Sequence, residues 1–144
     1  MDFIKTSTFL FLFALNISYC QQIKWMSLDQ ALKQQKIKPK KIIMDVYTKW
    51  CGPCRLLDKK TFGNPDVSRY ISQNFYAVKF NGDTTDTLTL NNHHMYNSDP
   101  LYVKKTEKSR GKAHWFAHSI LDGKLSYPSY VVLDENLVRL MVYN

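Results

Sequence analysis

Residues 41–57 read KIIMDVYTKWCGPCRLL, and this stretch decides the fold. Residues 41–48 are mostly apolar and favour β-structure, which is typical of a strand covered on both faces. Two cysteines follow, and Leu56 and Leu57 continue into a helical pattern. Pro53 is compatible with that helix because it falls in the first turn. The cysteines are therefore predicted at the turn that leads from a buried strand into a helix.

The sequences on either side of this stretch predict an α/β domain. Helices are expected over residues 27–35, from Asn64 onward and over residues 113–121, and strands over residues 76–80, 129–135 and 137–143. Ser27 and Gln30 have the spacing of a capping box at the start of the first helix. Residues 81–112 are polar and are interpreted as an insertion, with a small hairpin around Leu101–Val103. The order of elements predicts an α/β sandwich around a mixed β-sheet.

The N-terminal sequence predicts export. An apolar run, FLFLFALNI at residues 9–17, is much shorter than the roughly 20 residues that span a bilayer. Because SYC follows it, residues 1–20 are interpreted as a signal peptide and residues 21–144 as one mature domain. The alternative is a lipoprotein, in which Cys20 would be acylated and would bring the chain into contact with a membrane.

The composition is that of a globular protein. Of the 144 residues, 44% are apolar, 14% are aromatic and 22% are charged, and the formal net charge is +8. Basic residues gather in two clusters, residues 33–41 and 104–112, and neither cluster interleaves aromatic residues as a groove for single-stranded nucleic acid does. The charge is interpreted as solvated faces with some attraction to acidic partners or lipid headgroups, and nucleic acid is not expected as a partner.

Three uses of the cysteine pair have to be compared, because Cys51 and Cys54 are the only cysteines after residues 1–20. No metal site is expected, since there is no second Cys-x-x-Cys and the histidines of residues 93–94 and 114–118 fit a solvated loop and a helix face. A permanent structural disulfide would close too small a loop to stabilise the fold much. Redox exchange is therefore the favoured use.

The expected position of the pair suits exchange chemistry. Cys51 lies in the first turn of the expected helix, where unpaired backbone N–H groups and the helix dipole stabilise a thiolate. Cys54, one turn deeper, should be shielded and less acidic. This difference allows Cys51 to attack a substrate disulfide and Cys54 to resolve the mixed disulfide. Gly52 and Pro53 keep the two sulfurs close enough to form a bond.

The sequence WCGPC at residues 50–54, behind an apolar strand, resembles the active-site sequence of thioredoxins. On this motif and on SYPSYVVLDE at residues 126–135, the chain is identified as a member of the thioredoxin-like superfamily and is similar to exported bacterial thiol–disulfide oxidoreductases. The resemblance implies a thioredoxin-like fold, with the insertion before the strand that follows a cis-proline. The chain lacks the C-terminal helix of that fold, so we expect either a truncated chain or a sheet face without its cover.

The resemblance also implies roles for single residues. Asp45 matches a buried acid that relays a proton to or from Cys54, and a carboxyl group in an apolar strand is expected to have a raised pKa. Pro128 matches the cis-proline, and the backbone of Tyr127 is implied to pair with a bound substrate strand. The implied substrate-binding residues are Trp50, Gly52, Pro53, Tyr127 and Pro128.

The implied activity is the reduction of protein disulfides in the bacterial periplasm, because the Gly-Pro dipeptide between the cysteines resembles that of the reducing members. No cofactor is expected beyond the Cys51–Cys54 disulfide. The expected partners are protein disulfide substrates and a thiol electron donor or acceptor. Two alternatives stay open: a thiol oxidase or isomerase, and a thioredoxin-fold binding module in which the insertion and the Tyr127 loop recognise a partner while redox activity is incidental.

Overall fold

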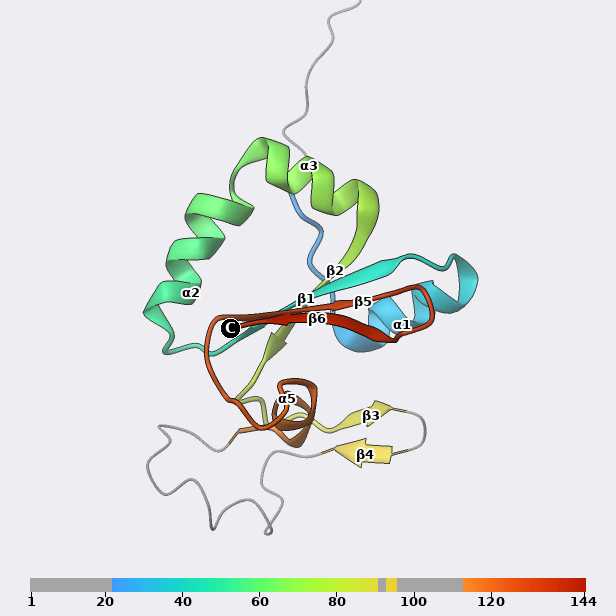
Figure 1. The fold of residues 1–144 in the computed structure, drawn as a ribbon, viewed down its shortest axis with the longest axis vertical. Helices are drawn as coiled ribbons and strands as arrows, with labels where there is room; N and C mark the ends of the chain where they lie inside the picture. The colour runs from blue at the N-terminus through green and yellow to red at the C-terminus, as the bar shows by residue number, and fades with distance from the viewer. Residues whose placement is uncertain (1–21, 91–92, 96–112) are drawn as a thin grey trace, which may run out of the picture.

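The structure is a computed structural model that describes residues 22–90, 93–95 and 113–144 (Figure 1). The expected signal peptide at residues 1–20, with Cys20, and the hairpin expected around Leu101–Val103 lie outside the described residues. Among the described helices, none is both long and apolar enough to cross a membrane.

A mixed four-stranded sheet forms the centre of the domain, as the sequence predicted. Its order is β2 (Phe75–Asn81), β1 (Lys41–Tyr47), β5 (Ser129–Leu133) and β6 (Arg139–Tyr143). β1 runs parallel to β2 and antiparallel to β5, and β5 pairs antiparallel with β6. β1 is paired on both sides, and its successive residues 44–46 are all buried, so it is covered on both faces as its apolar sequence indicated.

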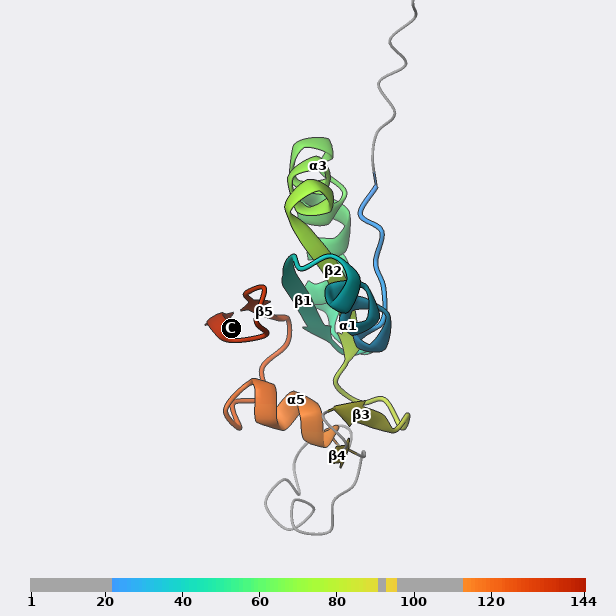
Figure 2. The ribbon, with the colours of Figure 1, turned by 90° about the vertical axis from the view of Figure 1, so that its right-hand side faces the viewer.

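Helices lie on both faces of this sheet (Figures 1 and 2). One face carries α2 (Gly52–Leu57), a π-helical segment η1 (Asp58–Phe62) and α3 (Pro65–Asn74), and the other carries α1 (Leu28–Ile37) and α5 (Trp115–Ile120). The predicted capping box is present at α1, where Ser27 and Gln30 each accept a hydrogen bond from the other's backbone N–H. Asn64 caps α3 through its side-chain oxygen, again as predicted.

The alternation of side chains along β1 divides them between two unequal cores. Ile42, Met44 and Val46 belong to the larger apolar cluster, which includes residues of α1 and α5. Ile43 packs on the opposite face against a smaller cluster built with α3 and η1. Because successive residues of a strand point to opposite faces, Asp45 shares the face of Ile43. The chain therefore places a carboxyl group on the face that carries α2, η1 and α3.

Part of the expected insertion has regular structure that the sequence did not predict. β2 extends through Asn81, and a hairpin of β3 (Leu88–Leu90) and β4 (His93–Met95) follows it. Each hairpin strand is three residues long, which is too short for an alternating pattern to be recognised. Leu88 is buried in the larger core, so tertiary packing helps to hold the hairpin in place.

The C-terminal strand forms one edge of the sheet. It begins at Arg139, two residues later than predicted, because Leu137 lies in the preceding turn with a φ of 64°. Val138, Leu140, Met141 and Tyr143 are all more than half exposed, so the described helices leave this edge uncovered.

A buried histidine joins α5 to the body of the domain. His114 was expected on a helix face, but it precedes α5 as its N-cap and is fully buried. Its Nδ1 accepts a hydrogen bond from the Phe116 N–H at 3.1 Å, and its Nε2 contacts the Asp86 carbonyl oxygen at 3.0 Å. Its backbone N–H donates to the Gly82 carbonyl at the end of β2. Burial lowers the pKa of His114, because the neutral ring fits this site better than the charged one.

We predict that His114→Asn lowers the free energy of unfolding by about 1–2 kcal/mol at pH 7.5, because a buried hydrogen-bonded ring is lost. The folded-state pKa lies below the ordinary value of 6.5, so the stabilisation is present above that pH and decreases as the pH falls further. Urea unfolding of both proteins at pH 7.5 and pH 5.5 should show the difference becoming smaller. A difference that stays constant would contradict the prediction.

Candidate active site

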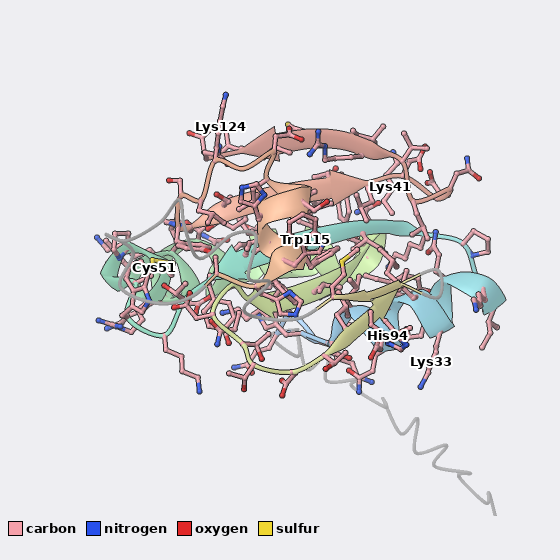
Figure 3. The ribbon with its side chains drawn as sticks, turned by 90° about the horizontal axis from the view of Figure 1, so that it is seen from below. Lys33, Lys41, Cys51, His94, Trp115 and Lys124 are labelled. Carbon is pink, nitrogen blue, oxygen red and sulfur yellow. A yellow bond between two sulfur atoms is a disulfide. The ribbon has the colours of Figure 1, made fainter. Side chains whose placement is uncertain are left out.

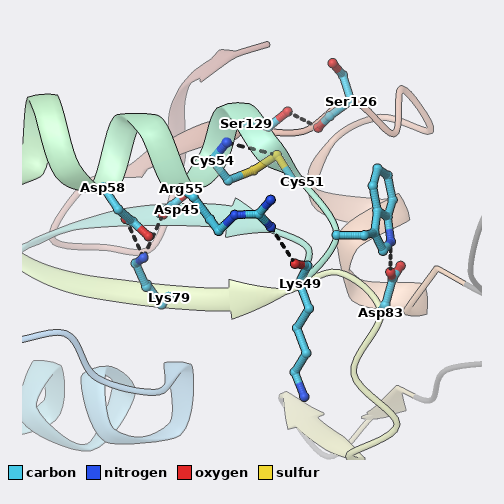
Figure 4. Close-up of a disulfide and its surroundings, with 11 residues drawn as sticks. Asp45, Lys49, Cys51, Cys54, Arg55, Asp58, Lys79, Asp83, Ser126 and Ser129 are labelled. Carbon is cyan, nitrogen blue, oxygen red and sulfur yellow. Dashed lines mark hydrogen bonds and ion pairs between the residues drawn. A yellow bond between two sulfur atoms is a disulfide. The ribbon is translucent and has the colours of Figure 1, made fainter.

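The two cysteines form a disulfide at the turn between β1 and α2, where the sequence placed them (Figure 4). The sulfurs of Cys51 and Cys54 are 2.00 Å apart. Cys51 is the N-cap of α2, and its Sγ accepts a hydrogen bond from the Cys54 N–H at 3.1 Å. A backbone donor directed at this sulfur stabilises negative charge on it, which is the property that an attacking thiolate needs.

The surroundings of the disulfide differ from the expectation in one respect. Cys54 is shielded as predicted, with 4% of its surface exposed, but Cys51 is equally shielded at 3%. The S–S bond holds both sulfurs at the start of α2, so both cysteines are shielded from solvent in this oxidised form. Gly52 and Pro53, between them, are exposed. A side chain at Gly52 would meet no described atom within 4 Å, so the surface next to the pair is open.

Asp45 is the buried acid of the site. It is 2% exposed, and its Oδ1 has no hydrogen-bond partner among the described residues. Burial raises the pKa of Asp45 to about 6, while the nearby Lys79 lowers it and Asp58 raises it further. The raised pKa is the one expected for a carboxyl group in an apolar strand. Lys79 approaches from β2, with its Nζ 3.6 Å from Asp45 Oδ2.

An aromatic wall stands next to the disulfide. Trp50 is 48% exposed, and its indole N–H donates a hydrogen bond to Asp83 Oδ2. The Trp50 and Tyr127 rings meet edge to face with centroids 5.9 Å apart. The Tyr127 hydroxyl lies against Gly82, where the tip of the ring occupies the space that any larger side chain would need. The wall therefore combines the turn before Cys51, the end of β2 and the segment before β5.

The segment before β5 also carries the proline. The Tyr127–Pro128 peptide bond is cis. Ser129, the first residue of β5, pairs with Val46 near the end of β1, so the strand register brings Pro128 to the end of the sheet that carries the disulfide. Figure 4 draws Ser126 and Ser129 beside the cysteine pair, and the Ser129 hydroxyl donates to the Ser126 carbonyl oxygen. Asp45, the disulfide and the proline segment, which the sequence had linked, thus meet at one end of the domain.

His94 does not lie beside the disulfide. Figure 3 shows Cys51 at one end of the domain and His94 on the far side of Trp115 from it. In the part of the chain that the structure describes, no three His, Cys, Asp or Glu side chains are grouped so that they could hold a metal ion.

Comparison with known proteins agrees with this geometry. The model of the family described as "thioredoxin-like domain" matches residues 28–136. The chain belongs to this family.

Solved structures support the fold of this thioredoxin-like chain. A DsbH oxidoreductase superposes with a TM-score of 0.54 at 15% identity, covering 85% of this chain and 72% of that one. A disulphide isomerase from Xylella fastidiosa Temecula1 superposes with a TM-score of 0.51 at 17% identity, covering 79% and 68%. At these identities the likeness concerns the fold.

A curated relative matches only part of this chain. The thiol:disulfide interchange protein DsbD of Klebsiella pneumoniae is 45% identical over 42 residues, which are 29% of this chain. The match covers 7% of the length of that relative.

The sequence did not identify three charged residues of this thioredoxin-like site, namely Lys79, Asp58 and Asp83. Lys79 stands in a short alternating strand, and Asp58 lies four residues after Cys54 on the same helical segment. A lysine in a strand is a weak signal, because a solvent-facing lysine on an edge strand gives the same pattern. Their contacts with Asp45 and Trp50 depend on how the strands and helices pack.

We predict that Asp45→Asn stabilises the oxidised protein at pH 7.5 by up to about 3 kcal/mol, at 1.36 kcal/mol for each pH unit by which the pKa is raised. A carboxyl group whose folded-state pKa is raised from 3.8 to about 6 destabilises the fold progressively as the pH rises between these values. The gain should therefore fall to a small fraction of this value near pH 4. Urea unfolding at both pH values measures it.

The matched control is Asp66→Asn, at an exposed residue of α3 that pairs with Arg69. This control should change stability by only a few tenths of a kcal/mol. If Asp45→Asn gave no gain at pH 7.5, or the same gain at both pH values, the fold would not raise the pKa of Asp45 and the prediction would be wrong.

Proposed function

We propose that this protein catalyses thiol–disulfide exchange and reduces protein disulfides. The observation that carries the proposal is the Cys51–Cys54 disulfide at the start of α2, on the sheet face that also carries the buried Asp45. The helix start supplies a hydrogen bond to the Cys51 sulfur, and burial gives Asp45 a pKa of about 6. A thiolate and a carboxyl group that titrates near neutral pH are what the two halves of an exchange reaction require.

The proposed reaction begins with the reduced pair. The Cys51 thiolate attacks one sulfur of the substrate disulfide, and the other substrate sulfur leaves as a thiolate and takes a proton from water. Cys54 then gives its proton to Asp45 and attacks Cys51 Sγ, which releases the second substrate sulfur as a thiolate that takes a proton from water. The substrate gains two electrons, and the protein is left with the Cys51–Cys54 bond. A thiol donor must reduce this bond again before the next turnover.

The aromatic wall and the proline segment are the proposed substrate-binding surface. A peptide strand that pairs with the backbone at Tyr127 would gain main-chain hydrogen bonds next to the disulfide, as in other cases of strand addition. Trp50, half exposed and fixed by Asp83, would contact the same strand. Gly52 and Pro53 leave the approach open, because they are exposed and lie between the cysteines.

The proposed location is the bacterial periplasm, supported by the apolar run at residues 9–17 and by the partial match to a thiol:disulfide interchange protein. Residues 1–20 would be removed on export, or Cys20 would carry a lipid. The proposed direction, reduction, rests on the Gly-Pro dipeptide of the motif, since thioredoxin itself has a potential near about −270 mV.

We predict that Cys51→Ser abolishes reduction of a fluorescent peptide disulfide, whereas Cys54→Ser accumulates a mixed disulfide with the peptide. Without Cys54 the mixed disulfide has no internal thiol to resolve it. Mass spectrometry of the Cys54→Ser protein measures the adduct, and Thr85→Ser, at an exposed residue, is the control. Retention of partner binding and cellular phenotype in both cysteine variants would instead favour a binding module.

The direction of exchange has a separate test. We expect equilibration of the Cys51–Cys54 pair with glutathione buffers to give a potential within about 50 mV of −270 mV, the thioredoxin value. A value near about −120 mV, that of a strong oxidant, would assign the protein to thiol oxidation instead.

A further inference from the structure

We propose that Asp58 is a positioning residue for Asp45 and that it acts through Lys79, by holding the Lys79 ammonium group away from the buried carboxyl group and toward solvent. The consequence for catalysis rests on the proposed exchange reaction. The arrangement of the three side chains does not, because it belongs to the oxidised protein without any substrate.

The distances show which carboxyl group holds the lysine. Lys79 Nζ is 2.5 Å from Asp58 Oδ1, a charge-assisted hydrogen bond, and 3.6 Å from Asp45 Oδ2, which is too long for one (Figure 4). The strand register alone would have favoured the other pairing, because Asp45 on β1 stands directly opposite Lys79 on β2. Asp58, reaching down from η1, is therefore the residue that takes the ammonium group.

Two further contacts, both with aromatic rings, hold the ammonium group in this position. Lys79 Nζ lies over the ring of Trp25 at 5.1 Å and over the ring of Tyr47 at 5.2 Å, both within the range of a cation–π interaction. The Trp25 ring is itself held edge to face against Phe62 of η1. The cation therefore has favourable contacts on several sides and gains little from moving closer to Asp45.

An open pocket explains why Asp58 can hold the lysine. Asp58 and Lys79 line a pocket of about 370 Å³ together with Trp25 and Phe62. The side chains of Asp58 and Lys79 are 40% and 22% exposed, whereas that of Asp45 is 3% exposed. Water in this pocket can solvate the Asp58–Lys79 pair, so these two charges avoid much of the desolvation cost that an ion pair with Asp45 would carry.

The charged and titratable groups around Asp45 come from each element packed against it. They are Lys79 from β2, Asp58 from η1 and Tyr130 from β5. Asp58 acts on Asp45 in two ways, and both favour the protonated form of the Asp45 carboxyl group. Its own negative charge disfavours a second carboxylate nearby, and its hydrogen bond keeps the compensating ammonium group at 3.6 Å.

This arrangement affects the second half of the proposed reaction. A carboxyl group that holds a proton near neutral pH is a stronger base toward the Cys54 thiol than one with an ordinary pKa. If Lys79 moved to Asp45, the carboxylate would be stabilised and would accept the proton less readily. Asp58 would thus maintain the basicity of Asp45 without touching the reacting sulfurs.

The first experiment titrates the Asp45 carboxyl carbon by NMR in the oxidised protein, where the disulfide cysteines do not titrate. Asp58→Asn should lower the proton affinity of Asp45 by about tenfold, because both effects of the Asp58 charge are lost. Asp58→Glu should keep most of the wild-type value, and Asp66→Asn, at an exposed residue, should leave it unchanged. An Asp45 titration that is the same in Asp58→Asn and wild type would overturn the proposal.

Lys79→Met provides a second test that does not require Asp58 to change. This variant should raise the proton affinity of Asp45, and adding Asp58→Asn to it should have a smaller effect than Asp58→Asn alone, since no ammonium group remains to be released. Equal effects of Asp58→Asn with and without Lys79 would refute the role of Lys79. The titrations also stay informative if the proposed reaction is wrong, because they involve no substrate.

The pH profile of peptide-disulfide reduction completes the test. In Asp58→Asn the limb that reports Asp45 should move to lower pH together with the NMR titration. A purely structural role for Asp58 would lower the unfolding midpoint without moving either curve, and that result would count against the proposal.

Discussion

The burial of one carboxyl group, that of Asp45, is the constraint on which the rest of the site depends. β1 is paired on both sides and covered on both faces, so water is excluded from a charge placed in its middle. An isolated carboxylate in such a place is costly, and the protein can reduce that cost by binding a proton or by placing a cation nearby. This domain does both in part: the pKa of Asp45 is raised, and Lys79 stands at the edge of ion-pair distance.

The two faces of the sheet differ: one carries most of the apolar core, and the other carries the charged side chains beside the disulfide. The face that carries α1, α5 and the β3–β4 hairpin holds the larger apolar core. The opposite face holds a smaller apolar cluster beside the Asp45, Lys79 and Asp58 side chains. A polar group can be accommodated there because the larger core supplies most of the apolar burial elsewhere. α2, which begins at the disulfide, lies on this second face.

The aromatic wall connects the proposed substrate surface to a distant part of the chain. Trp50 depends on Asp83, Tyr127 packs on Gly82, and the Gly82 carbonyl accepts the backbone N–H of His114. The buried His114 ring in turn caps α5. The segment that the sequence describes only as a polar insertion thus begins with the residues that hold the wall in place.

The sequence by itself determined most of the helices and strands and the position of the cysteine pair, because alternation, caps and turn residues are local signals. It placed the disulfide between β1 and α2, marked Asp45 as a buried acid and located Pro128 before β5. Only the tertiary structure decided which charges surround Asp45, since strand register and the packing of η1 bring Lys79 and Asp58 together from separate segments. It also decided the β3–β4 hairpin, whose short strands depend on the core they cover. Long-range electrostatics and packing leave no periodic pattern in a sequence, and this is the physical reason for the division.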